Sequence, residues 1–164
     1  MTLEGLDLEA IGIAAAAALV VATIGGLLTD LGPWYKGLVQ PRWKPPDWAF
    51  GPIWTLIFAA AAAAGALAWQ RAPNDASRLC MVLQFALNGA LNILWSVLYF
   101  RLKRPDWALA ELVLLWLSVL GLIVAMAAYS PGSSWLLVPY LLWVAIAGCL
   151  NVETIRLNRP FGKR

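Results

Sequence analysis

Histidine is absent from the 164-residue chain, and cysteine occurs only twice, as Cys80 and Cys149. The absence of histidine removes the commonest general base, the usual metal ligand and the usual axial ligand of haem. The cysteines fall near opposite ends of their hydrophobic runs, so we expect no disulfide and no metal site. Gly-rich phosphate loops and nucleophile elbows are also missing from the sequence. These absences disfavour metal-dependent and hydrolytic enzymes, and we expect no required cofactor.

Charged residues are also scarce, at 13% of the chain, against 62% hydrophobic residues and a mean hydropathy of +0.73. A soluble domain of this length has more polar surface than such a composition provides. Uncharged runs cover residues 10–29, 48–70, 79–100 and 112–152. A membrane-spanning helix needs about 20 apolar residues, and the last run divides into two spans at the turn-forming residues 130–134. The sequence therefore predicts five transmembrane helices.

The predicted fold is all-α, an integral membrane bundle formed by a single domain of residues 1–164. We expect its helices at residues 10–28, 51–69, 77–100, 106–129 and 135–156. Acidic residues, Glu4, Asp7 and Glu9, precede the first helix, whereas a cleaved secretory signal begins with basic residues. The first helix is therefore expected to be retained.

Positive charge is distributed unevenly between the two ends of these helices. One side of the membrane receives ten basic residues: Lys36, Arg42, Lys44, Arg101, Lys103, Arg104, Arg156, Arg159, Lys163 and Arg164. The other side receives only Arg71 and Arg78. The positive-inside rule then places the N-terminus outside and the first loop and C-terminus inside. The net charge of +3 reflects this topology, and we expect no nucleic-acid partner.

The first connection, residues 29–50, is long, stiff and aromatic. Pro41, Pro45, Pro46 and Pro52 fix φ in or beside it, so the loop has few conformations to lose. Its large apolar side chains are Trp34, Tyr35, Trp43, Trp48 and Phe50. We expect the loop to fold over the bundle mouth as a lid. An interfacial belt of aromatic side chains is the alternative, which accounts for the tryptophans but not for the prolines.

Aromatic and amide side chains gather in the helix halves nearest this loop, with Asn88 and Trp143 closer to mid-membrane. The set is Trp54, Phe58, Asn88, Asn92, Trp95, Trp107, Glu111, Leu114, Trp143, Ala147, Leu150 and Asn151. Indole and amide groups around an apolar chamber suit a flat hydrophobic ligand with a few polar groups. The alternative is that the buried amides only hold helices together. Glu153 is expected to pair with Arg156, three residues further along its helix.

Three segments of the chain resemble one known family. They are WYKGLVQPRWKPPDWAFGPIW (34–54), ALNILWSVLYF (90–100) and VPYLLWVAIAGCLNVETIRLN (138–158). Over about residues 26–156 the chain is similar to the bacterial tryptophan-rich sensory proteins and the mitochondrial translocator protein, or peripheral-type benzodiazepine receptor. The resemblance implies a homodimeric five-helix bundle whose pocket opens toward the first loop. It implies porphyrins such as protoporphyrin IX, haem and sterols as ligands. We also expect membrane lipid as a partner of the bundle.

The resemblance also implies a set of ligand-binding residues. The matching positions are Trp43, Phe50, Ile53, Trp54, Asn92, Trp95, Trp107, Ala110, Leu114, Trp143, Ala147 and Leu150. Phe58 replaces a tyrosine common in the family, which removes a hydroxyl group from the pocket and is expected to alter ligand preference. Val152 replaces the tyrosine of a cholesterol-recognition pattern and disfavours high-affinity cholesterol binding.

Our leading hypothesis is a membrane receptor or sensor for porphyrin-type tetrapyrroles. The ring would stack on Trp54, Trp95 and Trp143, and its propionates would reach Arg42 or Lys44. A second hypothesis is light-dependent porphyrin degradation, for which the resemblance implicates Trp54 and Trp143. A third is transport of porphyrins or sterols, against which the lack of internal repeats and of a deep charged pathway argues.

Overall fold

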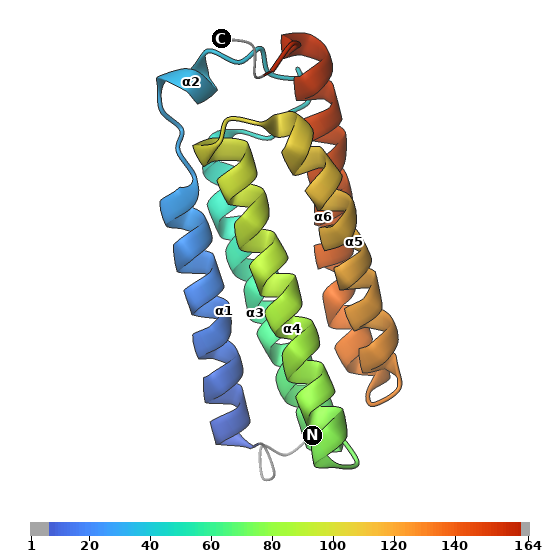
Figure 1. Cartoon of the computed structure of the whole chain (residues 1–164). Coiled ribbons are helices and arrows are strands. Elements are labelled where there is room, and N and C mark those ends of the chain that lie inside the picture. The colour runs from blue at the N-terminus through green and yellow to red at the C-terminus, as the bar shows by residue number, and fades with distance from the viewer. Residues whose placement is uncertain (1–6, 162–164) are drawn as a thin grey trace.

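The computed structural model describes residues 7–161 and consists of helices joined by short connections, apart from the long first loop (Figure 1). The long helices are α1 (Leu8–Leu28), α3 (Asp47–Arg71), α4 (Asp75–Ser96), α5 (Pro105–Ala127) and α6 (Pro131–Asn158). A π-helical turn, η1 (Val97–Arg101), extends α4, and the short helix α2 (Pro33–Lys36) lies in the first loop. Within these residues, five helices are long and apolar enough to cross a membrane. The predicted all-α membrane fold is confirmed.

Helix α6 begins at Pro131, four residues before the expected start at residue 135, because residues 130–134 form a helix start and not only a turn. The Ser130 side chain accepts a hydrogen bond from the Ser133 amide at 3.3 Å, and Pro131 occupies the first helical turn. Both are common features of helix N-termini. The opposite end of the chain shows the same device, since Asp7 caps α1 by accepting from the Ala10 amide at 3.0 Å.

The five long helices form a ring. Each helix packs mainly against two others, in the order α1, α3, α6, α5, α4 and back to α1. Helices α5 and α6 share the most extensive interface, whereas no residue of Leu8–Leu28 in α1 is buried. Although α3 and α4 are consecutive in the chain, they make few contacts with each other. Space therefore remains inside the ring, between α1 and the other long helices.

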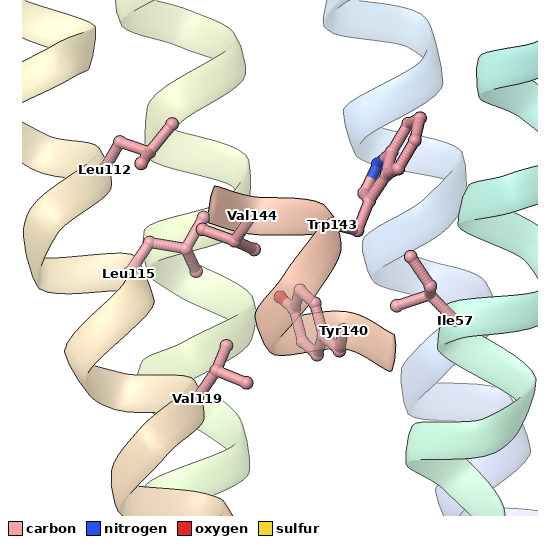
Figure 2. Close-up of a cluster of buried hydrophobic side chains, with 7 residues drawn as sticks. All are labelled: Ile57, Leu112, Leu115, Val119, Tyr140, Trp143 and Val144. Atoms are coloured by element: carbon pink, nitrogen blue, oxygen red, sulfur yellow. The ribbon is translucent and has the colours of Figure 1, made fainter. Parts of the chain in front are cut away.

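The central core lies on the α3–α5–α6 side of this ring. Its buried residues come from α3 (Ile57), α5 (Leu112, Leu115, Val119) and α6 (Tyr140, Trp143, Val144), and Figure 2 shows them converging between the helices. A second cluster, which includes Met81, Met126 and Leu137, lies toward the turns that join α3 to α4 and α5 to α6. A third cluster forms beneath the first loop from Tyr35, Tyr99, Phe100 and Ala108.

A layer of buried polar side chains crosses the middle of the ring. The Tyr140 hydroxyl donates to Asn88 Oδ1 at 3.1 Å and accepts from Asn92 Nδ2 at 3.2 Å. Asn88 Nδ2 in turn donates to Ser118 Oγ at 2.8 Å, which joins α4 to α5 as well as α6. Water is absent from the hydrocarbon core of a bilayer, so these groups must satisfy one another. The two asparagines therefore do hold helices together, as the alternative interpretation requires.

Replacing Tyr140 by phenylalanine should destabilise the bundle by about 1–2 kcal/mol, because it leaves two buried amide groups without a shared partner. The expected result is an earlier midpoint of unfolding when the purified protein is titrated with a denaturing detergent. Tyr129→Phe, near the end of α5, is the matched control and should leave the midpoint unchanged. Equal midpoints for the two variants would show that the polar layer contributes nothing to stability.

Candidate ligand-binding site

The first loop is anchored to the bundle through its aromatic side chains. Tyr35, on α2, is buried and its ring lies 5.8 Å from that of Phe100. Trp34 meets Tyr99 edge-on, with ring centroids 6.1 Å apart. Pro33 at the first position of α2 fixes the backbone that presents both aromatic residues to the end of α4. The loop therefore covers one end of the ring and does not extend away from it.

The middle of the loop is tied to the end of α6 by one asparagine. The Val39 amide donates to Asn158 Oδ1 at 2.8 Å, and Asn158 Nδ2 donates back to the Val39 carbonyl at 2.9 Å. The same amide nitrogen also donates to the Thr154 carbonyl at 2.8 Å, which fixes the orientation of the asparagine side chain. Sequence reasoning missed this contact, because the two residues are far apart in the chain.

A hydrogen-bonded group of three side chains joins α2, the last part of the loop and the first residue of α3. Lys44 Nζ donates to Asp47 Oδ1 and to the Tyr35 hydroxyl, and that hydroxyl donates to the same Asp47 oxygen at 3.0 Å. Burial alone would lower the pKa of Lys44. The hydrogen bonds to Asp47 and Tyr35 stabilise the charged ammonium group by more than burial disfavours it, so the pKa of Lys44 is raised. Burial raises the pKa of the Tyr35 phenol. At neutral pH the group therefore holds a charged lysine beside a neutral phenol.

Beneath the loop lies a cavity of about 510 Å³, which we call the loop cavity. Its volume is in the usual range for small-molecule sites, about 300–1,000 Å³. All five long helices and the loop contribute to its wall. The lining residues are Ala22, Gly25, Gly26, Thr29, Leu31, Tyr35, Gln40, Lys44, Asp47, Phe50, Gly51, Trp54, Thr55, Phe58, Asn92, Trp95, Ser96, Tyr99, Phe100, Leu112, Leu115, Trp143, Val144, Ala147, Leu150, Asn151 and Thr154.

Many of the predicted site residues line this cavity together. They are Phe50, Trp54, Phe58, Asn92, Trp95, Trp143, Ala147 and Leu150. Their rings contact one another, since Trp54 stacks on Phe58 at 5.2 Å and Phe50 meets Trp143 edge-on at 5.5 Å. The indole nitrogen of Trp95 is buried and has no hydrogen-bond partner in the described part of the chain. The cavity wall thus combines aromatic faces with an unused donor.

The predicted residues of α5 lie elsewhere. Trp107, Ala110 and Leu114 are exposed on the outer face of that helix, and none of them lines the loop cavity. The inner face of α5 carries Leu112 and Leu115 instead. Trp107 and Leu114 therefore do not join the chamber expected from the sequence, and of the three expected residues Trp107, Glu111 and Leu114 only Glu111 is buried. The Arg104 guanidinium lies over the Trp107 ring, with its Cζ atom 4.2 Å from the ring centroid.

Two predicted residues outside α5 also lie away from the cavity wall. Trp43 is exposed on the first loop, and Ile53 packs against the central core. Arg42, the second cation expected at the mouth, is exposed and does not line the cavity, whereas Lys44 does. Glu153 lies 3.7 Å from Arg156, which is the expected pair along α6.

Sequence reasoning missed many lining residues, among them all three on α1. Gly25 and Gly26 face the cavity, and their lack of side chains leaves room for it. Ser96 also lines it, and its position one helical turn after Asn92 was the available signal. On α1 no such signal exists, because the helix is apolar on all sides. Among the described residues, no group of three or more metal-binding side chains occurs here or elsewhere.

The fold and this site define an integral, multi-pass membrane protein, in which five spanning helices surround a cavity closed by the first loop. The chain belongs to the TspO/MBR family, whose sequence model matches residues 13–157. The resemblance drawn from the three sequence segments is thereby confirmed.

The chain is similar to several characterised family members. It is 37% identical over 129 residues to the tryptophan-rich protein TspO of Chlorobaculum tepidum, a match that covers 76% of this chain and 79% of the relative. It is 36% identical over 138 residues to the tryptophan-rich sensory protein of Cereibacter sphaeroides, covering 84% of each chain. It is 34% identical over 147 residues to the translocator protein of Sus scrofa, covering 85% of this chain and 87% of the relative.

Replacing Asn158 by alanine should release the loop from α6, because both hydrogen bonds to Val39 are lost. Two such bonds contribute about 1–3 kcal/mol, so trypsin should cleave after Arg42 about tenfold faster. Cleavage at this bond, followed by mass spectrometry, reports the open population of the loop. Leu157→Ala, which removes an exposed neighbouring side chain, is the control. A cleavage rate equal to that of the control would mean that the asparagine does not hold the loop.

Proposed function

We propose that this chain is a membrane receptor or sensor that binds porphyrin-type tetrapyrroles, such as protoporphyrin IX or haem, in the loop cavity. The observation that carries the proposal is that Trp54, Trp95 and Trp143 all line one cavity beneath the loop. A flat aromatic ligand gains both apolar burial and ring stacking from such a wall. The names of the relatives, a tryptophan-rich sensory protein and a translocator protein, agree with a role in ligand recognition at a membrane.

Polar groups at the cavity support a ligand that carries carboxylates. Lys44 lines the mouth and stays charged at neutral pH, so it offers a partner for a propionate group. In the present structure Lys44 binds Asp47, and a bound propionate would share the ammonium group with that carboxylate. The unpartnered Trp95 indole nitrogen is a second donor, since buried indole N–H groups usually find a hydrogen-bond partner.

Removing either of two cavity tryptophans should weaken porphyrin binding. We expect Trp54→Ala and Trp143→Ala to raise the dissociation constant for protoporphyrin IX by about five- to thirtyfold, because each loses a stacking face worth about 1–2 kcal/mol. Binding is followed in darkness by the absorbance of the porphyrin added to detergent-purified protein. Trp135→Ala is the matched control, because Trp135 is 72% exposed at the far end of α6. Affinities that match the control in both cavity variants would refute the proposal.

The placement of Trp54 and Trp143 on one cavity also makes the degradation hypothesis testable with the same samples. Illumination in the presence of oxygen should then convert bound porphyrin to a product with new absorbance bands, with turnover, and both variants should lose this activity. Binding without consumption under light would leave the receptor function and exclude the enzymatic one.

We also propose that the loop cavity opens on the positively charged side of the membrane, with the N-terminus on the opposite side. The test uses a membrane-impermeant thiol reagent on intact cells that express a Cys80→Ser/Cys149→Ser background. A cysteine at the exposed position Pro73 should react from outside, whereas one at Arg159 should react only after lysis. The reverse pattern would invert the proposed orientation.

A further inference from the structure

A second cavity, of about 650 Å³, lies between α1, α3 and α4 on the side of the polar layer away from the first loop. We call it the groove cavity. Its lining residues are Ala10, Ile13, Ala14, Ala17, Ala18, Val21, Phe58, Ala61, Ala62, Gly65, Ala66, Trp69, Met81, Val82, Phe85, Ala86, Asn88, Gly89, Ala90, Ile93 and Tyr140. Most of these are apolar, and many are alanine or glycine, so the space exists because side-chain volume is missing from three facing helices.

The groove cavity is elongated along the helices. Its wall extends from Ala10 to Val21 on α1, from Phe58 to Trp69 on α3 and from Met81 to Ile93 on α4. At 1.5 Å per residue each stretch is about 16–18 Å long. One leaflet of the hydrocarbon core of a bilayer is about 15 Å thick. The length and direction of the cavity therefore match those of a lipid acyl chain in that leaflet.

The deep end of the groove cavity is closed by the polar layer. Phe58 lines both cavities, and its ring lies 6.4 Å from that of Tyr140. The polar atoms of Asn88 and the Tyr140 hydroxyl are already hydrogen-bonded to each other and to neighbouring side chains. An occupant of this end consequently meets an apolar surface and gains nothing from a polar group of its own. A hydrocarbon tail satisfies this condition better than a sterol hydroxyl or a porphyrin carboxylate.

At the other end of the groove cavity a cation, Arg78, lies beside a lining residue, although Arg78 itself does not line the cavity. Trp69 lines this end, and the Arg78 guanidinium lies 5.2 Å from the centroid of its ring. The Arg78 side chain is 38% exposed, its Nη1 contacts the exposed Asp75 at 3.3 Å, and its guanidinium makes no other hydrogen bond among the described residues. Arg71 is engaged differently, since it donates to Ser130. Arg78 is thus a donor available to an anionic group at the membrane surface.

We propose that the groove cavity binds one acyl chain of an anionic glycerophospholipid, whose phosphate is held by Arg78 beside Trp69. The apolar side chains of the wall contact the acyl chain, and the length of the cavity limits how deeply that chain inserts. The Arg78 guanidinium beside the cavity binds the phosphate and so favours an anionic lipid. The site is separate from the loop cavity and does not depend on the function proposed for it, since the layer containing Phe58 and Tyr140 divides the two.

Filling the cavity is the direct test. In Ala14→Leu/Ala18→Leu the added side chains enter the groove cavity, where both alanines are half-buried lining residues. In the control, Ala15→Leu/Ala16→Leu, the same volume is added to exposed positions that do not line it. Delipidated full-length proteins are titrated with dioleoyl phosphatidylglycerol, and the bound lipid is counted by native mass spectrometry. We expect the filled variant, but not the control, to lose one tightly bound phospholipid.

The headgroup contact is tested separately with Arg78→Gln. The variant loses a charge-assisted hydrogen bond to the phosphate, so affinity for dioleoyl phosphatidylglycerol should fall about tenfold or more. Affinity for dioleoylglycerol, which has the same chains but no phosphate, should not change in this variant. This comparison also covers the case in which the filled variant does not fold, because Arg78→Gln adds no side-chain volume to the groove cavity.

Three outcomes would overturn the proposal. They are equal phospholipid retention by the filled variant and its control, equal phosphatidylglycerol affinity with and without the Arg78 guanidinium, and displacement of the bound phospholipid by a sterol at matched concentration. Protoporphyrin titration of the same variants separates this result from the first proposal. The filled variant should bind porphyrin like the control, whereas Trp54→Ala should lose porphyrin affinity and retain the phospholipid.

Discussion

The hydrogen-bonded layer of Asn88, Tyr140 and Asn92 is the constraint on which the interior of this protein depends. Five helices in a ring leave space between α1 and the others, and a bilayer supplies no water to solvate polar groups there. The Tyr140 hydroxyl acts as donor to one amide and acceptor from the other, so all three side chains are fixed relative to one another. That layer joins helices on opposite sides of the ring and divides its interior into two cavities with different chemistry.

The two cavities differ because different segments close them. The loop cavity is covered by a segment whose prolines limit its freedom and whose contacts with the bundle are distributed along it: Tyr35 near the start, Val39 in the middle and Lys44 near the end. The loop cavity therefore contains polar side chains, and the aromatic residues of the first loop cover it. The groove cavity has no such cover among the described residues and is walled by alanine and glycine, which leaves an apolar space beside the lipid phase.

Helix α1 contributes to both cavities while packing less tightly than any other long helix. Its small residues face the groove cavity in its first half and the loop cavity in its second. A close approach fixes it between them, since a Cβ atom added at Gly89 would lie 2.9 Å from the Val21 side chain. A larger residue at position 89 would push α1 outward, so the glycine sets the distance between α1 and α4. Occupants of the two cavities thus share one wall.

The sequence by itself determined the five spans, the family and the long aromatic loop, because hydrophobic length, sequence motifs and proline content are local properties of the chain. It also identified Trp54, Trp95 and Trp143, which the tertiary structure brings to one cavity. Only the tertiary structure decided that Trp107 and Leu114 face outward, that Asn158 holds Val39, and that a second cavity exists. The physical reason is that lipid-facing and interior side chains in a membrane are both apolar, so helix periodicity does not reveal which face is inside. Cavities and ring order arise from the packing of helices distant in sequence, which no local pattern records.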